Sequence, residues 1–288
     1  MPSLLRSIPG LYSVALLILM VVLSGCFGME ATLQINPDGS GTLTESAQFS
    51  PIGAEMMQSM AQSMDEEEDS RFQVFTEEEL RSEIDDEEAL EITSLTIEGQ
   101  YGERYERISH FENINDVAFG LDPDEALPDD TEDMGNGEVS TPGASIFDDI
   151  TFTFEPGTPA TLTVQMPPSE PSEAEEAPMM GEEMEGDPQM EQMMQMMSQD
   201  MRFRLAIDVN GTIVDTNARH VQENVVTLLD IDIEALVNAD AMEEAMEAIQ
   251  ALDRYETGEE RLNSEEMQLL DELDVRIETE DTIRITFE

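Results

Sequence analysis

The sequence predicts an α+β fold, in which a curved antiparallel sheet packs on Met-rich amphipathic helices and a helical C-terminal tail follows. Three observations lead to this prediction. Several short segments alternate apolar and polar residues with period two, which is typical of half-buried strands. Methionines, 21 of the 288 residues, recur at helical spacing in two segments. The chain beyond residue 239 combines helical spacing with many acids.

The first predicted element pair is a β-hairpin between Ala31 and Phe49. Leu33 and Ile35 share one face, and the alternation resumes after the turn and continues to Phe49. The turn reads Asn-Pro-Asp-Gly-Ser-Gly, in which Asp-Gly adopts positive φ values at low cost. Two alternating runs around such a turn indicate antiparallel pairing.

Three more hairpins and several single strands extend the predicted sheet. The hairpins cover 90–111 around Gly102, 150–166 around Pro156-Gly157, and 203–216 around Asn210-Gly211. Asn-Gly between alternating runs is the strongest short-range hairpin signal. Further strands are predicted at 224–231, 275–279 and 282–287.

Two methionine stripes predict the helices that cover this sheet. They comprise Ile52, Met56, Met60 and Met64, and then Met190, Met193, Met194, Met197 and Met201. Such stripes usually form a pliable apolar face, although thioethers also suit Cu(I). We expect the helices to line a deformable cavity, with Met56, Met60, Met193 and Met197 as ligand-binding residues. Two further helices begin at Thr76, in a capping box with Glu79, and at Asn263-Ser264.

The chain divides into a leader, one domain and a tail. Residues 1–25 are the predicted signal peptide, 26–238 the α+β domain, and 239–288 an acidic helical extension with terminal strands. Residues 122–143 and 167–188 are rich in Pro, Gly, Ser and acids, and we interpret them as disordered insertions.

The leader ends in a motif for lipid attachment. The apolar run from Leu11 to Leu23 is too short for a membrane span of about 20 residues, and a short run followed by small residues is typical of a secretory signal. Leu23-Ser24-Gly25-Cys26 resembles the bacterial lipobox, in which cleavage leaves the cysteine first and lipid is attached to its thiol. Acyl chains such as palmitate would then anchor Cys26 stably at the cell or outer membrane, outside the cytoplasm. The alternative is an uncleaved N-terminal anchor with an incidental cysteine.

The charge of the chain indicates a saline habitat. There are 67 acidic and 12 basic residues, all of the latter arginine, for a formal net charge of −55. Such an excess excludes the basic footprint of a nucleic-acid binder. It is typical of halophilic proteins, because concentrated salt screens the repulsion. An ordinary acidic, partly disordered chain is the alternative.

The sequence contains no pattern that predicts catalysis, a metal or a cofactor. One cysteine allows no disulfide within the chain, and His110 and His220 have no His or Cys nearby in sequence. The nucleophile-elbow, zincin and P-loop motifs are absent. We therefore predict a protein that is not an enzyme. An extracytoplasmic hydrolase would need a cleft where one of these histidines meets a carboxylate and a hydroxyl.

Three of these features together resemble the LppM-like domain of bacterial surface lipoproteins. They are Cys26, the Asp-Gly-Ser-Gly hairpin up to Phe49, and the strand, Asn-Gly turn and strand between Phe203 and Leu229. The resemblance implies a curved sheet packed on helices, and some such domains have been likened to lipid-transfer folds. Members often carry a membrane segment near the C-terminus, whereas the tail here is acidic.

Two functions follow as hypotheses. The first is a membrane-anchored module that binds an apolar or lipid-like ligand between the sheet and the helices. The second is a structural or assembly lipoprotein of the cell envelope that has a protein partner and no small ligand.

Overall fold

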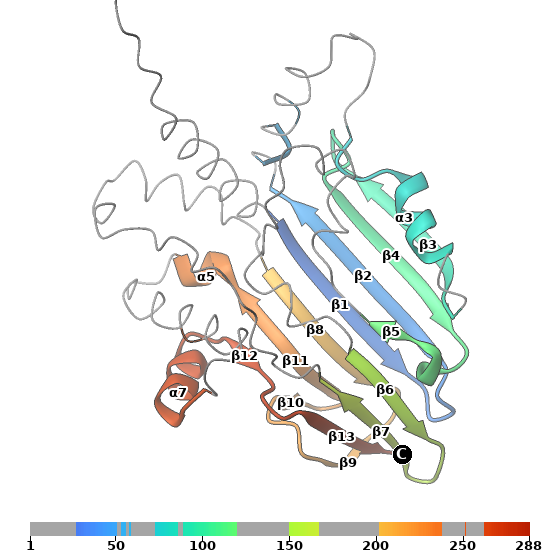
Figure 1. The fold of residues 1–288 in the computed structure, drawn as a ribbon, viewed down its shortest axis with the longest axis vertical. Coiled ribbons are helices and arrows are strands. Elements are labelled where there is room, and N and C mark those ends of the chain that lie inside the picture. Colours follow the sequence, from blue (N-terminus) through green and yellow to red (C-terminus); the bar gives the residue numbers. More distant parts are fainter. Residues whose placement is uncertain are drawn as a thin grey trace, which may run out of the picture.

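The protein forms two β-sheets, one lying over part of the other (Figure 1). The computed structural model describes residues 27–50, 53–55, 58, 73–85, 89–119, 150–166, 202–237, 251 and 262–288. Within these ranges strands outnumber helices, so the predicted α+β fold with Met-rich helices on a single sheet is wrong.

The larger sheet is built around the first hairpin. In order across the sheet, its strands are β10 (Val221–Gln222), β11 (Val225–Asp232), β8 (Arg202–Val209), β1 (Phe27–Ile35), β2 (Gly41–Phe49), β4 (Arg104–Phe111) and β3 (Glu91–Glu98), with β12 (Arg276–Ile277) paired to β11. The neighbours are antiparallel except β1 and β8, which are parallel, so the sheet is mixed.

The smaller sheet collects strands from distant parts of the chain. Its order is β5 (Ala118–Phe119), β6 (Ile150–Glu155), β7 (Ala160–Gln165), β13 (Thr282–Phe287) and β9 (Ile213–Thr216). The last strand therefore lies between β7 and β9, and β12 joins the larger sheet. The strands predicted at 275–279 and 282–287 are therefore present as β12 and β13. Because they complete both sheets, the description of this part of the chain as a helical tail is wrong.

The two sheets bury their apolar faces against each other. One hydrophobic cluster joins Leu33 of β1 and Ile207 of β8 with Leu162 of β7 and Ile285 of β13, all of them 0% exposed. Burying each such side chain contributes about 1.5–3 kcal/mol. Period-two alternation predicts that a strand has one buried face, but it does not say what covers that face. Here the cover is a second sheet.

The other half of the same face is covered by α3 (Glu77–Asp85) and the segment before it. The strand residues Ala47, Phe49 and Tyr105 pack there against Phe75 and Leu80. The Phe75 ring lies 5.7 Å from the Phe49 ring and 4.8 Å from the Tyr105 ring, centroid to centroid. The predicted capping interaction is present, since the Glu79 amide donates to the Thr76 hydroxyl at 3.3 Å.

The predicted first hairpin is confirmed, and its turn is held by its own side chains. Asp38 accepts hydrogen bonds from the Ser40 hydroxyl at 2.7 Å and from the Ser40 amide at 3.1 Å. These bonds lower the pKa of Asp38 below its ordinary value. Gly39 has a φ of 87°, which a side chain rarely tolerates.

The predicted hairpins at 90–111 and 150–166 are also confirmed, as β3 with β4 and β6 with β7. The predicted strand at 224–231 is β11. The C-terminal helix α7 (Ser264–Glu272) begins as predicted: Asn263 accepts the amides of Glu265 and Glu266 and completes a capping box. A shorter helix, α5 (Ile233–Val237), follows β11, and the 3₁₀ turn η1 (Ile114–Asp116) follows β4.

The predicted Asn210-Gly211 hairpin is wrong, because the strands on either side of it belong to different sheets. β8 is paired on both edges, by β1 and β11, which leaves no edge for β9. The Asn210 amide instead donates to Ile35 O at 2.8 Å. Neither Asn210 nor Gly211 has positive φ, as a type I′ turn requires. The chain turns a corner here, and β9 pairs with β13.

Candidate functional site

The five residues predicted to carry function are Cys26, Met56, Met60, Met193 and Met197, and all lie outside the described residues. Both predicted acidic insertions and every residue of the two methionine stripes do so as well. Among the described methionines, Met29, Met166 and Met267 are half-buried and pack against the main hydrophobic cluster.

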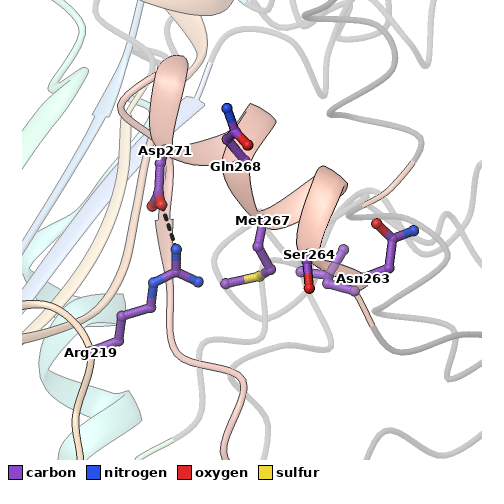
Figure 2. A pocket seen from close by; sticks show the side chains of 7 residues that line it. Arg219, Asn263, Ser264, Met267, Gln268 and Asp271 are labelled. Atoms are coloured by element: carbon purple, nitrogen blue, oxygen red, sulfur yellow. Dashed lines mark hydrogen bonds and ion pairs between the residues drawn. The ribbon is translucent and has the colours of Figure 1, made fainter.

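A hollow of about 320 Å³ lies beside the start of α7 (Figure 2). Its lining residues are Arg219, Leu262, Asn263, Ser264, Met267, Gln268 and Asp271. Arg219, from the connection between β9 and β10, forms an ion pair with Asp271 of α7 across this hollow, and both side chains are over 40% exposed. Two apolar side chains among seven do not make the apolar cavity that the sequence predicts for a lipid-like ligand.

The first amides of α7 do not point to an anion site. Asn263 already accepts the N–H groups of Glu265 and Glu266, and the Glu266 carboxylate accepts the Asn263 amide at 2.9 Å. The helix N-terminus is thus satisfied by its own cap. The exposed ion pair between Arg219 and Asp271 connects α7 to the β9–β10 connection, and such a pair contributes little to the free energy of folding.

A buried carboxylate, that of Glu278, holds the β9–β10 connection against the residue that directly follows β12. Glu278 is 2% exposed, and its Oε1 accepts the backbone amides of Arg219 at 2.6 Å and His220 at 2.8 Å. Burial raises the pKa of Glu278, against the opposing effect of those two amides. Nε2 of His220 is buried and has no hydrogen-bond partner in the part of the chain that the structure describes.

Neither histidine meets the geometry of a hydrolase within the described ranges. His110 lies on β4, opposite Thr42 of β2 and Glu91 of β3. No hydrogen bond joins either imidazole to a hydroxyl or a carboxylate of a described residue. Among the described residues, no group of three or more His, Cys, Asp or Glu side chains is placed to hold a metal ion.

A charged cluster cross-links three strands on the face of the larger sheet opposite the main core. Asp230 of β11 is buried and accepts Nε and Nη2 of Arg202 on β8, both at 2.8 Å. Arg276 of β12 lies 4.0 Å from the same carboxylate. This hydrogen bonding raises the pKa of Arg202. The two-pronged pairing fixes β8 against β11, which is a structural role.

The most informative feature for function is the start of β1. Phe27 follows Cys26 directly in the sequence, and it is already paired with Phe49 of β2. Two residues later, Met29 is also paired with Phe203 of β8. β1 therefore enters the middle of the larger sheet without any intervening segment between Cys26 and the fold. Among the described helices, none has the length and apolar character needed to cross a membrane.

Comparison with known proteins gives little further guidance. No protein-family model and no curated protein sequence matches the chain. Among solved structures, it is similar to the NMR structure of the folded domain of Mycobacterium tuberculosis LppM, at 9% identity. That match covers 73% of this chain and 84% of the other, with a TM-score of 0.27. The predicted resemblance to LppM-like domains thus finds only a weak structural similarity.

Proposed function

We propose that the protein is a lipid-anchored module of the cell envelope, displayed outside the cytoplasm and attached through Cys26. The observation that carries this proposal is the join between the lipobox-like motif and the fold, since β1 begins at Phe27. Cleavage before Cys26 would remove the apolar leader and leave every paired residue of β1 in place. An acylated Cys26 would then be the first residue, with the folded domain directly behind it.

The module is proposed to act through contacts with other envelope components. The alternative is an apolar or lipid-like ligand held in a cavity between the sheet and the helices. The structure gives this alternative less support, because the sheet face that should line the cavity is covered. The sheet face that should line the cavity is filled by β6, β7 and β13, whose inward side chains Ile150, Leu162 and Ile283 are 0% exposed. The described core is thus closed by a second sheet, which favours the assembly function.

Metabolic labelling with an alkyne fatty acid tests the anchor. We expect the protein to incorporate the label, to fractionate with membranes, and to have an intact mass that begins at Cys26 with acyl chains attached. Cys26→Ser removes the thiol that carries the lipid, so label incorporation should fall to background. Ser24→Ala is the matched control, because it keeps a small residue in the motif and should still be labelled.

An unmodified Cys26 thiol on a chain that retains its leader would contradict the proposal. So would equal labelling of the wild type and the Cys26→Ser variant.

A further inference from the structure

We infer that the domain stands end-on at the membrane, with the end where β1, β4 and β8 begin resting on the lipid headgroups. The inference rests on the proposed anchor at Cys26. It adds which surface of the fold faces the lipid and which faces away.

The length of the tether carries the inference. A residue in an extended chain spans at most about 3.6 Å, and no residue separates Cys26 from β1. β1 is a central strand, with β2 along one edge and β8 along the other. Because its first residues are already paired, the anchor cannot swing away from the sheet by unfolding a linker. The acyl chains therefore bring this end of the sheet to the membrane.

Strand direction identifies the other residues at this end. β8 runs parallel to β1, and β4 does so too, because both β1 and β4 are antiparallel to β2. All three strands run from upper left to lower right in Figure 1, and the smaller sheet and the C-terminus lie towards the end where they finish. Glu98, which ends β3, and the 99–103 turn lie at the anchored end.

Exposed acids lie at both ends of this axis, among them Glu30 of β1 and Glu98 of β3 at the anchored end, so the orientation rests on the short tether and not on charge. Arg104, the first residue of β4, is exposed at the anchored end. Guanidinium groups pair well with lipid phosphates. The turns at the opposite end carry the exposed acids Asp38, Glu112, Asp116, Glu155 and Glu223. These described turns contain no arginine.

A matched pair of labels on one edge strand tests the orientation. Glu91 and Glu98 are the first and last residues of β3, both are exposed glutamates, and they lie about 23 Å apart along the strand at 3.3 Å per residue. The acylated native Cys26 leaves Glu91→Cys and Glu98→Cys each with a single free thiol for a fluorophore. The labelled lipoproteins are placed in phosphatidylcholine–phosphatidylglycerol vesicles that contain a headgroup-nitroxide lipid, at about 1 M salt to screen charge.

We expect the fluorophore at position 98 to be quenched several-fold more than the one at position 91. Equal quenching, or stronger quenching at position 91, would overturn the orientation. Gln100→Cys and Glu112→Cys, both exposed and on either side of β4, form a second pair in case one β3 variant does not fold, with position 100 expected to be the more quenched.

The two proposals fail differently. If intact mass shows acylation and the protein is bound to vesicles, but the quenching order is reversed, the anchor stands and the orientation is wrong. If Cys26 is not acylated, the anchor itself is wrong, and the orientation falls with it.

Discussion

At the scale of single residues, the most consequential interaction is a buried ion pair in the middle of the larger sheet. Arg107 of β4 donates from Nε to Glu45 of β2 at 3.0 Å and from Nη1 to Leu80 O at 2.8 Å. Both side chains are less than 10% exposed. The pair lies between the two hydrophobic clusters and connects α3 to the sheet. When two charges are buried this well, removing one of them leaves the other without compensation in a site that excludes water.

Replacing Arg107 by Met should destabilise the protein by about 3–5 kcal/mol, because it leaves the Glu45 carboxylate buried without its partner. The measurement is equilibrium urea unfolding at constant high salt. The double variant Glu45→Leu with Arg107→Met should recover a large part of the loss, since no unpaired charge is left.

Arg81→Met serves as the control. Arg81 pairs with Glu77 on the surface of α3, where both side chains are about half exposed or more. Its loss should cost less than about 1 kcal/mol. If Arg107→Met is no more harmful than Arg81→Met, the buried pair is not what joins α3 to the sheet.

At the scale of elements, the first hairpin depends on one glycine that has no room for a side chain. A Cβ on Gly41 would lie 2.0 Å from Gln34 O and 2.6 Å from the Phe111 ring. The carbonyl belongs to the facing strand β1, and it cannot move away without loss of pairing. Glycine is therefore needed here for the close approach of β1, β2 and β4.

Gly41→Ala should lower the free energy of unfolding by about 1–3 kcal/mol, the usual cost of forcing extra atoms into a packed site. Thermal unfolding followed by circular dichroism measures the loss. Ser46→Ala, on the opposite face of the same strand, is the comparison and should change stability by less than about 0.5 kcal/mol. Equal stability of the Gly41→Ala and Ser46→Ala variants would show that the strands separate there without cost.

At the scale of the whole molecule, net charge sets the conditions in which the fold persists. A formal charge of −55 on 288 residues favours any expanded state that separates the carboxylates. Ion pairs such as that of Arg202 with Asp230 offset only a small part of this charge, because the chain has 12 basic residues against 67 acidic ones. We therefore expect screening by salt to supply much of the remaining compensation.

We expect the protein to be expanded in dilute buffer and compact above about 1 M salt, with most of the gain below that concentration. The reason is that the Debye length falls from about 10 Å at 0.1 M to about 3 Å at 1 M. Circular dichroism and small-angle scattering across a salt titration measure this transition. Full structure without added salt would contradict the predicted halophilic character.

The candidate site was predictable from sequence only in part. The lipobox-like motif depends on residue types in one short segment, so Cys26 can be proposed as the lipid-bearing residue without a structure. Glu45 and Arg107 could not be paired in this way, since 62 residues separate them and acids are abundant throughout. The pairing of Arg219 with Asp271 beside the hollow could not be predicted for the same reason, since 52 residues separate the two.

The sequence by itself determined the local structure: where strands run, where Asp38-Gly39 turns the chain, and where Asn263 starts a helix. These features depend on alternation and on side chains that bond their own backbone, and both are local. Only the tertiary structure decided which strands pair and what covers each apolar face. Asn210-Gly211 looks like a hairpin locally, but both edges of β8 are occupied by distant strands. A buried face needs only apolar contact, which a second sheet supplies as well as a helix does.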